Sequence, residues 1–415
     1  MQAKKIFSCV IALLTLVGCT SNTKPKEVCK ELEEKLKYYD ESYSNSTFNI
    51  EKIDCMNDKK DFIHSIDSSF LYAIEKDGKT YKDFDMKERD YFDILKDNNV
   101  NAIRLRLYHD YTSPSGQLRN GDLSLDNVIS MGKRAKKKGM KIILSLQYSD
   151  TWADPDSQDC PYAWKDKTYD EAKTLLYEYT KEVVSSFKKN KAEIDYIQIG
   201  NEINSGMCYP YGEINWDNEN TINEGFDRFV GLLKEGIRAV KEITPNAKTI
   251  IHTSNSLRMN EYTSNPENAF WFYQKLADRN LEYDIIGSSF YYIYDKTPIS
   301  KVTPFINAIV EKFNKDFFLM EYSYGYTLRY GDDTPNILYT TNKDPDYPLT
   351  ISGQASYMRD IIQAVASSNR TLGTSYWGGE WIVNNSIDYN NWENQALFTF
   401  DGYALPSLKV FKEIY

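Results

Sequence analysis

The sequence is poor in histidine and has no excess of positive charge. Its three histidines, His64, His109 and His252, lie far apart and show none of the short spacings that hold zinc. No metal site is therefore predicted, although this argument leaves carboxylate-bound calcium open. The formal net charge of the 415 residues is −10, which argues against a nucleic-acid partner because phosphate-binding surfaces are normally basic.

The N-terminus begins with basic residues and an apolar stretch, 6–17, that is too short to span a bilayer permanently. The stretch ends in Leu-Val-Gly-Cys at 16–19, which resembles a bacterial lipobox, in which the cysteine is lipidated and becomes the new N-terminus. We therefore expect a signal peptide over 1–18 and lipidation of Cys19. The protein would then lie in the cell envelope, outside the cytoplasm, and contact the membrane only through its lipid. A secretory peptide cleaved elsewhere is the alternative.

Two segments of different composition follow the signal peptide. Residues 19–61 are rich in Lys, Glu, Asp, Ser and Asn, which predicts a flexible tether. From residue 62 to 415, short apolar runs alternate with longer amphipathic stretches, which predicts one α/β domain with parallel strands, because each return to a parallel strand needs a crossover.

Eight strand–helix units close naturally into a (β/α)₈ TIM barrel. An open doubly wound sheet is the alternative, but no glycine-rich phosphate-binding loop follows any predicted strand, so no nucleotide cofactor is predicted. The strands are expected at 62–67, 102–108, 141–147, 195–200, 249–253, 283–290, 317–321 and 373–377. Helices are expected in the intervals, for example at 88–96, 170–188, 224–241, 265–278, 304–312 and 353–366.

The ends of the predicted strands carry the candidate chemistry, because active sites of such barrels form at the C-terminal ends of the strands. The second strand places Arg104 and Arg106 on one face, the fourth runs into Asn201 and Glu202, and the seventh ends in Glu321. Hydrolysis of a glycosidic bond needs an acid and a second carboxylate. Strands four and seven lie on opposite sides of the barrel mouth, so the two glutamates can flank a sugar. For either glutamate alone, a helix cap or an arginine ion pair remains the alternative.

At these positions the sequence resembles glycoside hydrolase family 53, the endo-β-1,4-galactanases of clan A. The similarity covers nearly the whole predicted barrel, from Asp67 to the last strand. Its most specific stretch is Tyr-Ser-Asp-x-Trp-Ala-Asp-Pro at 148–155, and Gln-x-Gly-Asn-Glu at 198–202 and the Glu-Tyr-Ser-Tyr segment at 321–324 also match.

The resemblance implies a retaining, endo-acting hydrolase of plant cell-wall β-1,4-galactan, the chain of arabinogalactan and of pectin side chains. It makes Glu202 the general acid/base and Glu321 the nucleophile. Asn201 would bind the sugar 2-hydroxyl, and Arg104 or Arg106 would keep Glu321 ionised. We expect a monomer without a cofactor. The other candidate substrate-binding residues are Gln147, Asp150, Trp152, His252, Tyr291, Trp377 and Trp381.

Three positions depart from the family pattern. Gln147 stands where the family has histidine, 291–294 reads Tyr-Tyr-Ile-Tyr in place of Tyr-Pro-x-Trp, and Gly378 stands where the family has glutamate, which would open space beside Trp377. None touches the two glutamates, so the departures bear on the substrate and leave the reaction type unchanged. Two alternatives therefore stay open: a clan relative acting on another β-linked polysaccharide, and a surface glycan-binding lipoprotein that has lost activity.

Four cysteines besides Cys19 remain after removal of the signal peptide: Cys29, Cys55, Cys160 and Cys208. Outside the cytoplasm they permit two disulfides in three pairings. Because Cys160 and Cys208 follow adjacent strands of the predicted barrel, their loops should meet at the mouth. We therefore expect a Cys160–Cys208 disulfide, which leaves Cys29 and Cys55 to pair within the tether.

Overall fold

The structure is a computed structural model that describes residues 48–415 except for 118–120, 255–268 and 385–389. The expected signal peptide, Cys19, Cys29 and the tether up to residue 47 lie outside the described residues. Within the part of the chain that is described, no helix is both long enough and apolar enough to cross a membrane.

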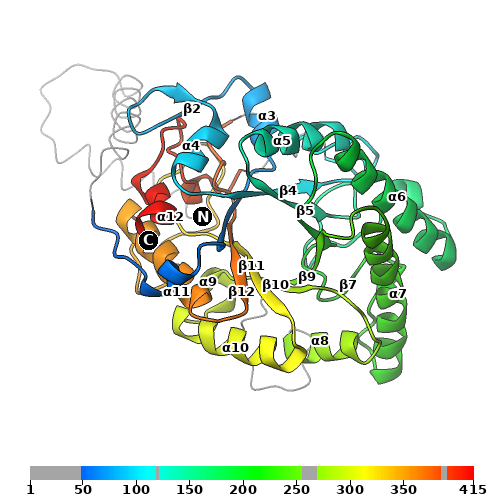
Figure 1. The fold of residues 1–415 in the computed structure, drawn as a ribbon. Helices are drawn as coiled ribbons and strands as arrows, with labels where there is room; N and C mark the ends of the chain where they lie inside the picture. The colour runs from blue at the N-terminus through cyan, green and yellow to red at the C-terminus, as the bar shows by residue number, and fades with distance from the viewer. Residues whose placement is uncertain (1–47, 118–120, 255–268, 385–389) are drawn as a thin grey trace, which may run out of the picture. The chain divides into compact units, whose positions relative to one another are not determined.

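Eight parallel strands close into a barrel in the order β1-β12-β11-β10-β9-β6-β5-β4, and β4 pairs with β1 (Figure 1). This confirms the predicted (β/α)₈ barrel. Each expected strand is present with its ends shifted by at most two residues. The strands are β1 (Ile63–Asp67), β4 (Ala102–Leu107), β5 (Lys141–Leu146), β6 (Tyr196–Ile199), β9 (Lys248–Thr253), β10 (Ile285–Ser289), β11 (Asp316–Tyr322) and β12 (Thr371–Tyr376).

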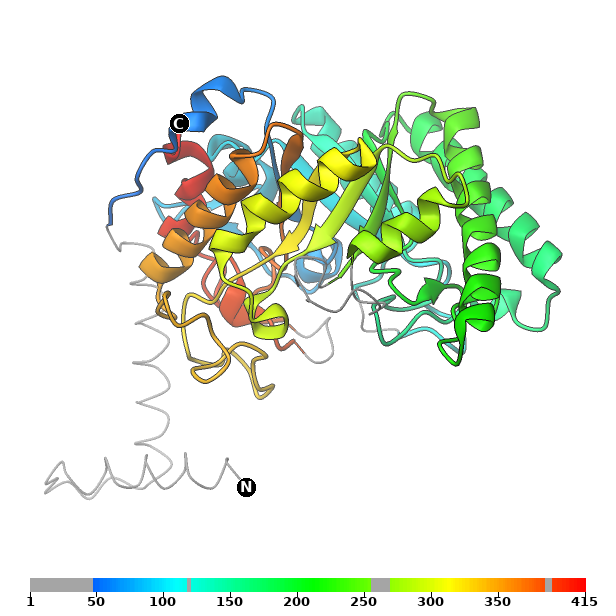
Figure 2. The ribbon, with the colours of Figure 1, turned by 90° about the horizontal axis from the view of Figure 1, so that it is seen from below.

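Helices surround the strands, and α8 and α10 lie along the outside of the barrel in Figure 2. Their starts follow from local capping: Thr168 and Glu171 form a reciprocal capping box at the start of α6, and Ser124 caps α5. The principal helices are α3 (Leu71–Lys76), α4 (Tyr91–Asp97), α5 (Leu125–Lys137), α6 (Tyr169–Lys189), α7 (Glu219–Ile243), α8 (Ala269–Ala277), α10 (Val302–Phe313) and α11 (Ile351–Ala366); the described residues also form the short α9 (Tyr292–Asp295) and α12 (Val410–Glu413).

The first expected helix begins later than predicted. The side chain of Asp90 accepts hydrogen bonds from the backbone N–H groups of Phe92 and Asp93, so α4 starts at Tyr91. Residues 88–89 instead form strand β3 (Glu88–Arg89), which pairs with β2 (Tyr81–Lys82) in a small antiparallel sheet. Glu88 is exposed and Arg89 is half-buried, so these two charged residues suit a strand at the surface as well as they suit a helix.

Packing on the barrel also begins ahead of residue 62, where the tether was expected to end. The 3₁₀ helix η1 (Asp54–Asp58) places Met56 in the core, and Ile53 is buried beside it. The backbone N–H of Ile53 donates to the carbonyl of Ile414 at 2.8 Å, which joins this segment to the C-terminal residues.

The loops that carry Cys160 and Cys208 meet as predicted, because Asp159 forms a β-bridge with Tyr209. The two cysteines are nevertheless free thiols, so the expected disulfide is absent from the structure. Cys208 Sγ instead lies 3.5 Å from the carbonyl oxygen of Tyr148, to which it donates. Cys55 is also free, and its expected partner lies outside the described residues.

Candidate active site

Glu202 and Glu321 meet at the C-terminal end of the barrel, directly after β6 and within β11. A carboxylate oxygen of each lies within 4.8 Å of one of the other and of a ring nitrogen of His252. Retaining glycosidases hold their two carboxyl groups about 5–5.5 Å apart, close enough for covalent attack on the sugar. The close approach of these two oxygens agrees with the retaining arrangement, whereas inverting enzymes hold their carboxyl groups about 6.5–9.5 Å apart to admit a water molecule.

The Glu321 carboxylate is buried and held from two sides. Tyr291 donates its hydroxyl to Oε2 at 2.9 Å, and Arg104 Nη1 lies 2.9 Å from Oε1 as an ion pair. Burial raises the pKa of Glu321, while Arg104 and Tyr291 act in the opposite direction. Burial and the charge of Glu321 raise the pKa of Glu202 well above its ordinary value. When the pair carries one proton, that proton therefore rests on Glu202, and Glu321 is the ionised partner.

Arg104 is the fixed centre of this site. Its Nη1 binds Asp67 Oδ2 at 2.9 Å as well as Glu321, its Nε donates to Gln198 Oε1 at 2.7 Å, and its Nη2 donates to Asn201 Oδ1 at 2.8 Å. All three guanidinium nitrogens are thus occupied in one geometry. Because arginine stays protonated and its fork is planar, it holds the Glu321 charge at a fixed position.

A chain of hydrogen bonds orients Glu202. Ser289 Oγ donates to Glu202 Oε1 at 2.5 Å, and His252 Nε2 lies 2.9 Å from the same Ser289 oxygen. His252 Nδ1 lies 2.7 Å from Gln198 Nε2 and 3.1 Å from Asn201 Oδ1. Because Gln198 Oε1 accepts from Arg104, its Nε2 is the donor to Nδ1, which assigns the proton of the neutral ring to Nε2. Burial, assisted by Arg104, lowers the pKa of His252 well below its usual range. Glu202 Oε1 is therefore an acceptor, which leaves Oε2 to carry the acid proton.

The backbone at the end of β6 is unusual. Gly200 has φ +84°, and Glu202 itself has φ +48°, a left-handed conformation that costs energy for a residue with a side chain. Gln158 holds this turn, because its Nε2 donates to the carbonyl of Asn201 at 2.8 Å and to that of Asp154 at 2.9 Å. The strained turn aims Glu202 across the mouth toward Glu321.

The two glutamates lie in the wall of a cavity of about 600 Å³. A cavity of this size fits a ligand of a few rings, and its wall combines aromatic faces with acidic and amide groups. The lining residues are Gln117, Trp152, Ala153, Asp154, Pro155, Asp156, Asn201, Glu202, Ser254, Tyr291, Tyr294, Glu321, Ile337, Trp377, Trp381, Asn391 and Trp392.

A family model described as glycosyl hydrolase family 53 matches residues 63–411, the whole of the barrel. The chain belongs to this family. An endo-beta-1,4-galactanase of Bacillus subtilis (strain 168) is 31% identical over 415 aligned residues, with 91% of each chain covered. The arabinogalactan endo-beta-1,4-galactanase of Cellvibrio japonicus is 28% identical and covers 86% of this chain and 92% of its own.

Solved structures of the family agree. The GH53 catalytic domain of Ignisphaera aggregans superposes with a TM-score of 0.77 at 35% identity, covering 86% of this chain and 96% of that one. A structure from a study of two fungal beta-1,4-galactanases gives a TM-score of 0.71 at 26% identity over 84% and 98%. The protein is therefore a glycoside hydrolase with a family 53 barrel.

The structure brings most of the predicted site residues of this family 53 enzyme together, in two shells. Asn201, Trp152, Tyr291, Trp377 and Trp381 line the cavity with the two glutamates. Arg104, Arg106 and His252 lie behind the wall and are almost fully buried. These three residues can therefore influence a bound sugar only through the cavity residues that they contact.

Two residues that were predicted to bind the sugar, Gln147 and Asp150, form hydrogen bonds with other protein groups and do not line the cavity. Gln147 Oε1 accepts from the N–H of Ala153 at 3.0 Å, and its Nε2 donates to Ser145 at 2.9 Å. Asp150 accepts from the N–H groups of Asp110 and Tyr162 and from the Ser113 hydroxyl, so it joins three loop segments. Both residues shape the loops of the mouth.

The site also contains residues that were not candidates from the sequence: Asp154, Tyr294 and Trp392 line the cavity, and Ser289 lies behind its wall. Asp154 falls inside the specific family stretch, and Tyr294 falls in one of the departures, so both carried a signal. Trp392 lies in a segment after β12 with no regular periodicity, and Ser289 is an ordinary strand residue until its contact with Glu202 is seen. Only the folded structure shows that Trp392 and Ser289 belong to the site.

Glu202, His252 and Glu321 are, in the described ranges, the one group of three side chains whose donor atoms could hold a metal ion. Both nitrogens of His252 already face hydrogen-bond partners, Gln198 and Ser289. Arg104 also places a positive charge beside Glu321. The trio is therefore suited to proton transfer and poorly suited to a cation.

Proposed function

We propose that this glycoside hydrolase cleaves β-1,4-galactan internally, with retention of configuration. The observation that carries the proposal is the pairing of Glu202 and Glu321 within 4.8 Å in an aromatic-walled cavity. The galactanase names of the relatives support the choice of sugar. The retention of an acid, a nucleophile and their partners argues against a binding protein that has lost activity.

In the proposed first step, an ionised oxygen of Glu321 attacks the anomeric carbon while the bond to the leaving oxygen breaks. The proton on Glu202 Oε2 passes to that leaving oxygen. In the second step the Glu202 carboxylate takes a proton from water, whose oxygen attacks the same carbon and releases Glu321. Asn201 Nδ2 donates one amide hydrogen to the carbonyl of Ala153 at 2.8 Å. In the proposed complex its other amide hydrogen donates to the 2-hydroxyl of the sugar.

The direct test is digestion of unsubstituted β-1,4-galactan by the soluble domain, with proton NMR of the first product. The β-anomer should appear first and convert slowly to the α-anomer, and oligosaccharides of mixed length should precede galactose. A panel of other β-linked polysaccharides, including a mannan and a glucan, runs alongside. Initial release of the α-anomer, or cleavage of another polymer with none of galactan, would overturn the proposal.

The departures from the family pattern bear on the finer substrate, and we propose a preference for a decorated or related β-linked chain. A Cβ at Gly378 would lie 3.8 Å from Trp381 and 4.0 Å from Trp392, so any side chain there would enter the aromatic wall. Gln147 acts through Ala153, a neighbour of Trp152. Gln147→His should then raise activity on plain galactan relative to the preferred polymer. If the parent already prefers plain galactan and the variant is only slower, this preference is wrong.

We further propose that the enzyme is a monomer attached to the cell envelope through a lipid on Cys19, with no other membrane contact. The basic start, short apolar stretch and small residues before the cysteine support this. Fractionation of expressing bacteria should find the parent with membranes and Cys19→Ser in soluble fractions. Equal partition of the two proteins would contradict the anchor, and a dimer by light scattering would contradict the monomer.

A further inference from the structure

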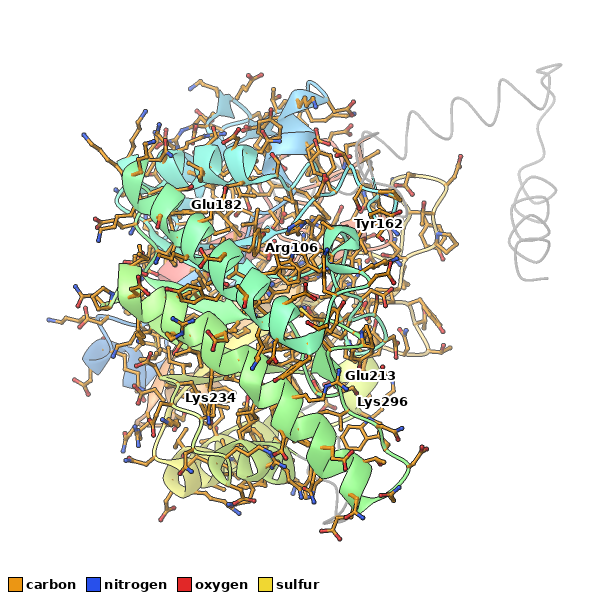
Figure 3. All side chains as sticks on the ribbon, turned by 90° about the vertical axis from the view of Figure 1, so that its right-hand side faces the viewer. Arg106, Tyr162, Glu182, Glu213, Lys234 and Lys296 are labelled. Carbon is orange, nitrogen blue, oxygen red and sulfur yellow. The ribbon has the colours of Figure 1, made fainter. Side chains whose placement is uncertain are left out.

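Arg106 lies beside Arg104 on β4 but has different surroundings. It is 1% exposed, and in Figure 3 it lies in the interior, behind the helices whose outer faces carry Glu182 and Lys234. Its Nε donates to Ser69 Oγ at 3.2 Å and lies 3.6 Å from Asp67 Oδ2. Its Nη1 and Nη2 are buried and have no hydrogen-bond acceptor among the described residues.

Three aromatic rings surround the Arg106 guanidinium. Its Cζ lies 4.4 Å from the ring centroid of Phe70, 4.3 Å from that of Trp152 and 4.6 Å from that of Trp377. Burying a cation without hydrogen-bond acceptors is costly. Aromatic faces compensate through cation–π attraction, which is strongest where water is excluded. The rings and the guanidinium therefore hold each other in place.

Two of these rings, Trp152 and Trp377, line the cavity, whereas Arg106 does not. Their centroids are 5.8 Å apart with the planes inclined at 56°. The two indoles come from different loops, after β5 and after β12, and Arg106 is a cation that both contact. An arginine whose nitrogens are covered in this way cannot reach a bound sugar.

We infer that Arg106 is a positioning residue that holds Trp152 and Trp377 at a fixed spacing and inclination, so that the two rings form one preformed wall for a sugar chain. The inference rests on the proposed function for the identity of that chain. The two arginines then have different main roles. Arg104 is ion-paired with Glu321 and lies farther from the Trp377 ring, at 5.6 Å, whereas Arg106 lies 4.6 Å from Trp377 and also contacts Trp152. Loss of Arg106 should therefore weaken binding, while the Arg104–Glu321 ion pair remains.

The test compares Arg106→Met and Arg106→Lys with the parent. Arg238→Met is the matched control, because Arg238 also lies over an aromatic ring, Tyr177 at 3.6 Å, but on the exposed face of α7. Galacto-oligosaccharide binding is measured by calorimetry in a Glu321→Ala background. Arg106→Met should raise Kd and KM by about tenfold, the size of one lost cation–π contact. Arg106→Lys should fall between this variant and the parent, since it keeps the charge and loses the planar stack.

A role in structure alone, or on Glu321, would give different results. Unchanged Kd in Arg106→Met would overturn the inference. Because the charge of Arg106 also lowers the pKa of Glu321, the pH profile is compared in Arg106→Lys, which keeps that charge. A lowered kcat with a shifted acidic limb in Arg106→Lys, at unchanged Kd, would overturn the inference as well. If Arg106→Met does not fold, Arg106→Lys decides, and parent-like affinity of that variant is the contrary result. Near-ultraviolet circular dichroism of the ligand-free proteins needs no substrate: it should change in the Arg106 variants and not in Arg238→Met. An unchanged spectrum overturns the inference even if the enzyme proves to act on another sugar.

Discussion

The two ends of the barrel interior are built from the same strands but in opposite ways. At the end where the strands begin, the inward side chains are apolar, with Ile63, Ala102, Ile143, Ile250 and Phe318 among them. At the other end they include Arg104, Gln198, His252 and Glu321, and each of these contacts a side chain on another strand. The comparison teaches that the first end stabilises the barrel and the second performs the chemistry.

The strongest test of this division removes the nucleophile. Glu321→Ala should lower kcat on galactan by on the order of 10⁴-fold or more, because covalent attack is lost. Thermal stability should not fall in proportion, since a buried carboxylate with a raised pKa is removed. Added azide should partly restore turnover and give a glycosyl azide of inverted configuration, identified by NMR. Near-parent activity without azide would show that another residue is the nucleophile.

Removing a large apolar side chain from the opposite end of the barrel should lower stability and leave catalysis nearly unchanged. Phe318→Ala should reduce the free energy of unfolding by about 3–5 kcal/mol through lost burial and a cavity, while kcat at 25 °C stays near that of the parent. Urea unfolding and steady-state kinetics measure the two quantities. Leu372→Ala, at a half-buried position beside the same cluster, is the milder control. A large loss of kcat with unchanged unfolding would abolish the distinction between the ends.

Glu380 is a buried acid near the mouth of the barrel with no role in the proposed chemistry. It therefore tests whether a buried charge at this end affects stability when it does not serve catalysis. Burial, and then the nearby Asp67, raise its pKa to about 8. The folded protein therefore binds this proton more tightly than the unfolded chain, so stability falls as pH rises from about 4.5 through 8. Glu380→Gln should remove part of this fall: its melting temperature relative to the parent should be higher at pH 9 than at pH 5. An equal difference at both pH values would contradict the assignment.

The smallest expected effect concerns Ser289. Its hydroxyl lowers the pKa of Glu202 by donating to the carboxylate. Glu202 must be protonated to act as the acid, so Ser289→Ala should raise its pKa and move the alkaline limb of kcat/KM to higher pH. Ser288→Ala, an adjacent buried serine that bonds to backbone, is the control and should leave that limb in place. A downward shift in the first variant would refute the hydrogen-bond chain.

The barrel and the catalytic pair could be predicted because both leave local signals. Apolar runs that alternate with amphipathic stretches mark strands and helices, and strand ends mark the mouth. Glu202 and Glu321 occupy such ends, and a specific family stretch supported them. The alternation of Arg104 and Arg106 likewise predicted that both lie on one face of the strand, and the structure buries both.

What the sequence could not supply depends on contacts between distant segments. Nothing local distinguishes Arg104 from Arg106, although one meets Glu321 and the other meets indole rings. Trp392 enters the cavity from an aperiodic segment. The expected disulfide was wrong for a similar reason: adjacency of Cys160 and Cys208 in the fold did not fix the direction of their thiols, and Cys208 faces a carbonyl.

The contacts of Arg104 also constrain how the enzyme gains activity during folding. One guanidinium joins Asp67 on β1, Gln198 on β6 and Glu321 on β11, and its partner Asn201 is 97 positions away along the chain. Such distant contacts form late, because loop-closure entropy must first be overcome. No partly closed sheet can hold all of them, so catalytic competence should recover only with the last strand pairing, after most of the far-ultraviolet circular dichroism signal has returned.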